Sequence, residues 1–118
     1  MNQQPTPFDV PGYESLASVL ERAYNQAARG KGKERHAKDQ PFHEQVMQVG
    51  AQHFGTGALL FQAFKKSEES QRLPHERAVA ELLGAINYLA GAVIAEERRH
   101  ADRTQAANDA TARGADRA

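Results

Sequence analysis

Cysteine is absent from the 118-residue sequence, which excludes disulfide bonds and thiolate metal sites. A charge excess is absent too, because 15 Lys and Arg residues balance 15 Asp and Glu residues. Proteins that coat nucleic acid usually carry a large positive excess, so neutrality argues against that class. No apolar run approaches the ~18 residues that cross a bilayer, and the first residues show no signal-peptide pattern. These absences predict a soluble, cytoplasmic protein with no membrane contact.

Strand patterns are missing as well. No segment alternates apolar and polar side chains with β-branched residues, and no Asn-Gly or Asp-Gly hairpin turn occurs. The fold class is therefore predicted to be all-α. Apolar residues at helical spacing predict a first helix over 13–29, for which Gly30 is a suitable C-cap.

The remaining elements are predicted to be a kinked helix and a long helix that together form an antiparallel helical hairpin. Glycine costs ~1 kcal/mol in a helix interior, so Gly55-Thr-Gly57 should separate a helix near 42–54 from one near 57–71. Leu73-Pro74 marks the hairpin turn, and the last helix should run to about Arg99.

Three regions follow from this pattern. Residues 1–12 contain three prolines and are expected to form an extended arm, and residues 13–100 a single helical domain. Residues 101–118 have no large apolar side chain, so we expect a disordered tail. A domain of roughly 90 residues is only marginally stable alone, and oligomerisation is a common remedy. We therefore expect a homo-oligomer.

The last predicted helix has two distinct faces. The apolar face consists of Val79, Leu82, Leu83, Ile86, Leu89, Val93 and Ile94. The second face carries the small or polar residues Ala80, Gly84, Asn87 and Gly91. Small residues at this spacing allow another backbone to approach closely, either a neighbouring helix or a second subunit.

The most informative segment is the run Arg29–Lys38, which holds five basic residues and one acid. Its two glycines leave backbone N–H groups accessible, and N–H groups among cations suit a phosphate. The candidate ligand-binding residues here are Lys31, Lys33, Arg35 and His36. A solvated loop that aids solubility is the alternative explanation. The run is not a P-loop, because G-x-x-x-x-G-K-[ST] and a preceding strand are both missing.

Two further candidates lie outside this run. Tyr24 is close to it in sequence and could stack on a base, although core packing is the ordinary role of an aromatic on an apolar stripe, as for Tyr88. Arg72, at the hairpin turn, could stack on a base from a second subunit or cap the helix end.

A catalytic centre finds little support in the sequence. The carboxylates Glu68, Glu69, Glu76 and Glu81 lack the Glu-x-x-Glu spacing of all-α pyrophosphatases, and adjacent acids point about 100° apart on a helix. His43 and His53 would lie roughly 15 Å apart along a helix, too far for one metal. We expect no catalytic residues, no metal site and no cofactor.

The hairpin sequence resembles the small phage immune-signal sponges that counter the CBASS and Thoeris defences. The resemblance covers about forty residues: a helix that ends in a Leu-Pro turn, then the spacing Leu82, Ala85, Tyr88 and an Ala-rich run to Ala95. It implies an oligomeric, non-catalytic protein in the host cytoplasm. Such a protein holds cyclic or ADP-ribose-type nucleotides between subunits, with an aromatic, a lysine and an arginine around the ligand. Tyr24, Lys33 and Arg72 are the candidates for these roles.

The leading hypothesis is therefore a phage-type anti-defence protein that sequesters a small phosphorylated nucleotide without turnover. An all-α, magnesium-dependent nucleotide pyrophosphatase is the first alternative. The second is an interaction protein that inhibits a host enzyme, with a host protein or nucleic acid as the partner of the basic run.

Overall fold

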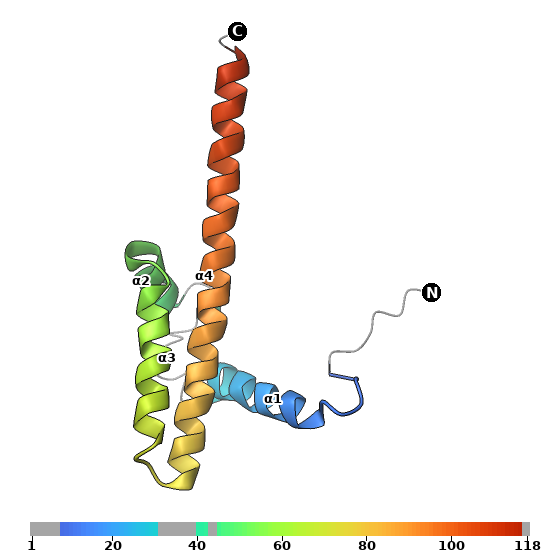
Figure 1. Ribbon diagram of the computed structural model, residues 1–118, viewed down its shortest axis with the longest axis vertical. Coiled ribbons are helices and arrows are strands. Elements are labelled where there is room, and N and C mark those ends of the chain that lie inside the picture. Colours follow the sequence, from blue (N-terminus) through green and yellow to red (C-terminus); the bar gives the residue numbers. More distant parts are fainter. Residues whose placement is uncertain (1–7, 31–39, 43–44, 117–118) are drawn as a thin grey trace.

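A computed structural model describes residues 8–30, 40–42 and 45–116. These residues form four α-helices and no β-strand, which confirms the all-α prediction. In chain order the helices are α1 (Glu14–Arg29), α2 (Val46–Phe54), α3 (Gly57–Ser70) and α4 (His75–Asp116). Figure 1 shows α3 lying alongside the first half of α4, with α1 crossing α4 and the second half of α4 projecting alone.

The helical hairpin of α3 and α4 is present as predicted. Its turn is closed by backbone hydrogen bonds from Arg72 N to Glu69 O (3.1 Å) and from Leu73 N to Ser70 O (3.4 Å). These bonds satisfy carbonyls that the end of a helix leaves without an intrahelical partner. Pro74 directly precedes α4, where a missing N–H costs no helical hydrogen bond.

The predicted break between α2 and α3 lies at Gly55. Its φ of 81° is in the left-handed region, which glycine enters without steric penalty. Its N–H still donates to Ala51 O at 2.8 Å. The Thr56 carbonyl then accepts from the N–H groups of Leu59 and Leu60, both at 3.0 Å, so the new helix begins at once in a new direction.

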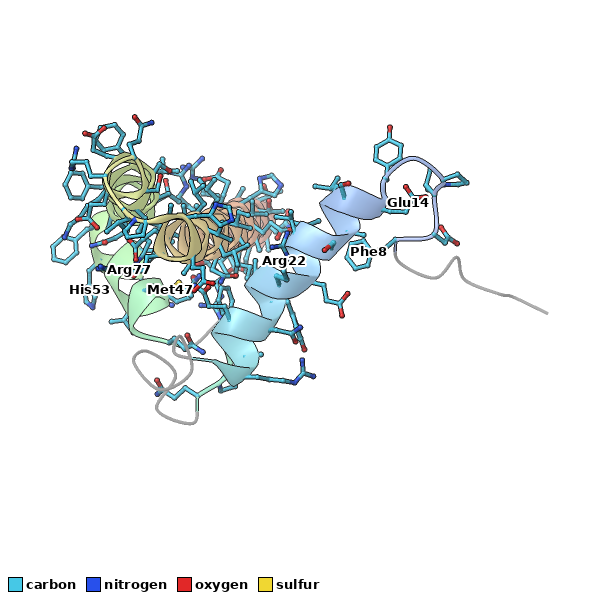
Figure 2. The ribbon with its side chains drawn as sticks, turned by 90° about the horizontal axis from the view of Figure 1, so that it is seen from below. Phe8, Glu14, Arg22, Met47, His53 and Arg77 are labelled. Atoms are coloured by element: carbon cyan, nitrogen blue, oxygen red, sulfur yellow. The ribbon has the colours of Figure 1, made fainter. Side chains whose placement is uncertain are left out.

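Helix α1 is attached to α4 by side-chain amides. Gln26 Nε2 donates to Ala80 O at 3.2 Å, and Asn87 Nδ2 donates to Ala23 O at 2.9 Å. Ala23 is buried at this crossing. Figure 2, seen from below, shows that the rest of α1 leads away from the hairpin, with Glu14 and Phe8 at its far end.

The small-residue face of α4 packs against helices of the same chain. A Cβ added at Gly84 would lie 3.1 Å from Lys66 Cδ on α3. At Gly91 it would lie 3.0 Å from Met47 Sδ on α2. The sequence allowed either a neighbouring helix or a second subunit to approach this face. The structure shows that neighbouring helices of the same chain do so.

The large apolar face of α4 is only partly in the core. Leu83 is 9% exposed, but Leu82, Leu89 and Val93 are 46%, 48% and 59% exposed. The reason is geometric: α1, α2 and α3 all gather on the small-residue side of α4. The opposite side therefore carries large apolar residues that the described residues cover only in part.

The buried hydrophobic core of the described residues is small. Five of its seven members are alanines, and the full set is Ala23, Ala51, Leu59, Ala63, Leu83, Ala85 and Ala92. The radius of gyration is 18.6 Å, against about 13.5 Å for a compact chain of this length. The accessible surface is 9191 Å², against about 6,300 Å² for a compact monomer of this mass. The single chain thus leaves much of its surface uncovered.

Residues 101–116 are helical, where the sequence led us to expect a disordered tail. They continue α4, and the side chains of 101–114 are all exposed. Propagation of an existing helix needs only favourable residues, because the costly nucleus is already formed in the packed half. The segment is rich in alanine, and Gln105 Nε2 donates to Asp109 Oδ1 one turn later at 2.9 Å.

The stretch 78–95 of α4 is more apolar than the sequence analysis allowed. Over 18 residues its mean hydropathy is 1.7, and Glu81 is its single charged residue. The expectation that no run approaches the length of a membrane span was therefore wrong. Core helices of soluble proteins meet the same criterion, and here the stretch packs against α1, α2 and α3, while 17% of it is buried.

Candidate functional site: a cavity between the four helices

A cavity of about 670 Å³ lies where α1, α2 and α3 meet α4. It takes side chains from every helix, and its lining mixes cations, amides and apolar groups. Figure 2 shows two of the lining residues, Met47 and Arg77, on the side of the hairpin toward the end of α1. Sites for small ligands usually have volumes in this range, with a few convergent polar groups.

Lys66 is the central cation of the cavity. Its Nζ lies 3.6 Å from Glu81 Oε2 and 5.9 Å from the centre of the Tyr88 ring. Its aliphatic stem rests against Gly84, where a Cβ would lie 3.1 Å from Cδ. Glycine at this position therefore lets the lysine lie along α4. Arg77, in the first turn of α4, adds a second positive charge to the lining.

Tyr88 contributes a half-buried phenol. Burial raises the pKa of Tyr88 above its ordinary value of 10.0, and the negative charge of Glu81 raises it further. The hydroxyl is thus protonated at neutral pH and is a hydrogen-bond donor and acceptor. Because the ring also lies beneath the Lys66 ammonium, the tyrosine joins the polar and apolar parts of the lining.

Side-chain amides supply most of the remaining polar lining: Gln26, Gln45, Gln62 and Asn87. Gln45 is 6% exposed and donates from Nε2 to Gln40 O at 3.2 Å. Gln26 and Asn87 are the residues that attach α1 to α4. The cavity is therefore built by the same contacts that position α1.

A second buried glutamine fixes α2 on α4 next to the core. Gln48 is 1% exposed, and its Nε2 donates to Gly91 O at 3.0 Å. Its buried Oε1 has no hydrogen-bond partner among the described residues. Buried acceptors without a partner are uncommon and costly. The hydrogen bond that Gln48 Nε2 donates to Gly91 O is therefore the interaction that positions this amide.

The predicted phosphate-binding residues Lys31, Lys33, Arg35 and His36 lie outside the described residues. The flanking positions are described, and they border the cavity: Ala27 precedes the basic run and Phe42 follows it. Both ends of the run are therefore connected to the cavity through only a few residues.

The other two predicted site residues do not line the cavity. Tyr24 is 61% exposed, and the Arg29 guanidinium lies 5.5 Å from the centre of its ring. Arg72 is exposed at the hairpin turn, where its Nη1 is 2.9 Å from Glu68 Oε1. The structure thus places Tyr24 and Arg72 apart from the cavity.

The carboxylates considered for magnesium are not gathered into one site. Glu68 pairs with Arg72 on the surface, and Glu81 pairs with Lys66 in the cavity. Across the described residues, no group of three or more His, Asp or Glu side chains is arranged to hold a metal ion.

Sequence reasoning did not single out Lys66 and Arg77, since each is an ordinary cation on a helix. One available signal was the small-residue face with Gly84 and Asn87, because a glycine and an amide within an apolar helix mark a close polar approach.

Comparison with protein-family models, curated proteins and solved structures finds no match. The resemblance to immune-signal sponges therefore stays a prediction, and the function must be argued from the cavity.

Proposed function

We propose that this protein binds a small phosphorylated nucleotide in the cavity and holds it without turnover. The observation that carries the proposal is the lining, in which two cations, four amides and a tyrosine surround about 670 Å³. Cations form the strong, charge-assisted hydrogen bonds that phosphates require. Amide side chains pair with the edges of bases, and aromatic rings stack on their faces.

The proposal assigns the phosphate to Lys66 and Arg77, the two cations of the described lining. Lys66 Nζ forms an ion pair with Glu81 Oε2 at 3.6 Å. An incoming phosphate would therefore compete with a carboxylate that already holds the ammonium group in position. The basic run Arg29–Lys38 supplies further cations in the proposal. Its support is that Ala27 and Phe42, on either side of the run, both line the cavity.

The biological role that we propose is sequestration of a nucleotide signal, as a phage-type anti-defence protein would perform it. The support for this role is the resemblance of the hairpin sequence to the immune-signal sponges. Binding without turnover is the proposed activity because the lining offers positioning and charge, while Glu68, Glu69 and Glu76, three of the four carboxylates of the alternative pyrophosphatase, lie outside it.

The test is a thermal-shift and calorimetric screen with cyclic dinucleotides, cyclic ADP-ribose isomers and nucleoside triphosphates, with and without magnesium. A ligand at ~100 times its dissociation constant should add about 2.7 kcal/mol to the unfolding free energy, which is several degrees for a domain of this size. Recovery of the intact ligand supports sequestration. A shift that requires magnesium and yields a hydrolysed product supports the pyrophosphatase instead.

Matched variants locate the site. Lys66→Met keeps most of the aliphatic stem and removes one charged donor, so affinity should fall about 10- to 100-fold. Lys65→Met, at the adjacent exposed position, should bind as the unmodified protein does. Charge reversal of Lys31, Lys33 and Arg35 together should also abolish binding while helicity is kept. Unchanged affinity in the Lys66→Met variant would remove the cavity from the proposal.

A further inference from the structure

The outward side of α4 carries a regular apolar repeat. Its members are Val79, Leu82, Ile86, Leu89 and Val93, which follow one another at intervals of three, four, three and four residues. We call this set the α4 seam. A 3-4 repeat of apolar residues is the pattern of a coiled-coil interface, with the first, third and fifth members at the a positions and the two leucines at the d positions.

The α4 seam is covered only in part by the described residues. Leu82, Leu89 and Val93 are 46%, 48% and 59% exposed, whereas Val79 and Ile86 are of intermediate burial. At 100° per residue the seam lies on the side of α4 opposite Gly84 and the cavity. Leu60 of α3 borders Leu89 and Val93 in a shallow apolar groove, which widens the exposed surface.

We propose that the α4 seam binds the α4 seam of a second copy of this chain as a parallel, two-stranded coiled coil. The residue types at the a and d positions indicate the number and the orientation of the helices. The a positions are β-branched (Val79, Ile86, Val93) and the d positions are leucine, and this combination favours two parallel strands over other assemblies. We therefore propose that the partner of the α4 seam is α4 of a second copy, aligned in the same register.

The chain as a whole exposes more surface than a compact monomer does. Its accessible surface of 9191 Å² exceeds that of a compact monomer of this mass by roughly 2,900 Å². Permanent dimers bury about 2,000–5,000 Å² in total, or half of that from each copy. The excess belongs to the whole chain, and it is large enough for an interface that covers the seam and the Leu60 groove beside it.

The apolar repeat ends at Val93. The next positions of the same register are Glu96, His100 and Arg103, and charged side chains at a and d positions would weaken a coiled coil. The proposed interface is therefore confined to residues 79–93, and it does not extend along the projecting half of α4.

A lipid bilayer is a less suitable occupant of the seam. The remaining circumference of α4 carries the Glu81–Lys66 ion pair and the hydrogen bonds of Asn87 and Gly91 with α1 and α2. One apolar side with polar, protein-packed sides opposite it fits a partner helix. Flotation with phosphatidylcholine–phosphatidylglycerol vesicles would reveal the bilayer alternative.

The first experiment is sedimentation equilibrium of the full chain. We expect a dimer, and Leu89→Lys should weaken it by about 100-fold or more, because a charge would be buried in the seam. The matched control is Phe61→Lys: Phe61 is 61% exposed on α3 and lies outside the seam and its groove, so this variant should stay dimeric. Circular dichroism verifies that both variants remain helical. A monomeric full chain, or equal dimerisation of the two variants, would overturn the proposal.

The second experiment fixes the orientation, using the absence of cysteine. Val79→Cys and Val93→Cys, made separately, should each form an intermolecular disulfide, since a disulfide needs Cα atoms within about 7 Å. The two positions are about 21 Å apart along the helix, so an antiparallel pair would cross-link neither. The control Ile94→Cys lies about 100° around the helix and should remain a thiol. Cross-linking only in a mixture of the two variants would refute the parallel arrangement.

This interface is independent of the proposed nucleotide site, because the seam and the cavity lie on opposite sides of α4. Leu89→Lys should therefore leave nucleotide affinity unchanged, and Lys66→Met should leave the dimer unchanged. The outcome also separates this chain from the sponges it resembles, for which the resemblance implies ligand pockets between subunits.

Discussion

The two faces of α4 reverse the usual relation between residue size and burial. The face toward α1, α2 and α3 carries Gly84, Asn87 and Gly91, whereas the face away from them carries Leu82 and Leu89. On the inner face, size is limited by how closely Lys66 and Met47 approach the helix. The comparison shows that the small residues of α4 lie where neighbouring helices approach, and that its large apolar residues lie on the side where no described helix packs.

The difference extends to the forces on each face. The inner face is held by hydrogen bonds between side-chain amides and backbone carbonyls, together with close packing around Leu59. Such bonds contribute about 1 kcal/mol each. The outer face keeps its apolar area, and with it the hydrophobic free energy that a partner would release. We therefore expect the single chain to have a low free energy of unfolding. In the proposed dimer, burial of the outer face would stabilise the chain more than the hydrogen bonds of the inner face do.

The inner face should be broken most severely at Leu59. This side chain is 2% exposed and packs with Ala51 and Ala92, so Leu59→Ala should lower the unfolding free energy by about 3 kcal/mol in urea denaturation. The neighbouring Leu60, 48% exposed, is the matched control. Leu60→Ala should cost much less at protein concentrations where the chain is monomeric. Equal losses at both positions would mean that the comparison of faces is wrong.

The close approach at Gly91 should be the next most sensitive feature. A Cβ there would lie 3.0 Å from Met47 Sδ and 3.4 Å from Gln48 Nε2. Gly91→Leu should therefore force α2 away from α4 and destabilise the fold by roughly 2 kcal/mol. Gly50 of α2 has no atom within 4 Å of an added Cβ, so Gly50→Ala should instead stabilise by up to about 1 kcal/mol. Thermal unfolding of both variants decides the sign at each glycine.

The attachment of α1 should respond more weakly. Asn87 Nδ2 donates to Ala23 O at 2.9 Å, and Asn87→Ala removes this bond at a cost of about 1 kcal/mol. Because α1 has few other attachments, the loss should appear as faster amide exchange in α1, with little change in α3. Asn108→Ala, on the projecting half of α4, is the control. Uniformly faster exchange in every helix would show that α1 unfolds with the hairpin and is not separately attached.

The fold could be predicted from the sequence because its signals are local. Helical spacing, the Gly55 break and the Leu-Pro turn each act within a few residues, and all three are present in the structure. The arrangement of faces could not be predicted, since periodicity identifies an apolar side without identifying what covers it. The cavity was missed for a similar reason: Lys66 and Arg77 line the same cavity only because α3 packs on α4. The tail at 101–116 was misjudged because a helix needs no apolar face once it has been nucleated.

The smallest expected effect concerns the phenol of Tyr88 on the inner face. Burial and the nearby Glu81 raise its pKa above 10.0, so the folded state holds the proton more tightly than the unfolded chain. The associated stability is fully present below pH 10 and is lost as the pH rises through the raised pKa. Between pH 8 and pH 11, the melting temperature of the Tyr88→Phe variant should therefore fall less than that of the unmodified protein. Tyr24→Phe, on the exposed side of α1, is the control, because lysine deprotonation affects all three proteins in the same way. If Tyr88→Phe and Tyr24→Phe respond alike, the phenol of Tyr88 is solvated, and the cavity opens further than its lining indicates.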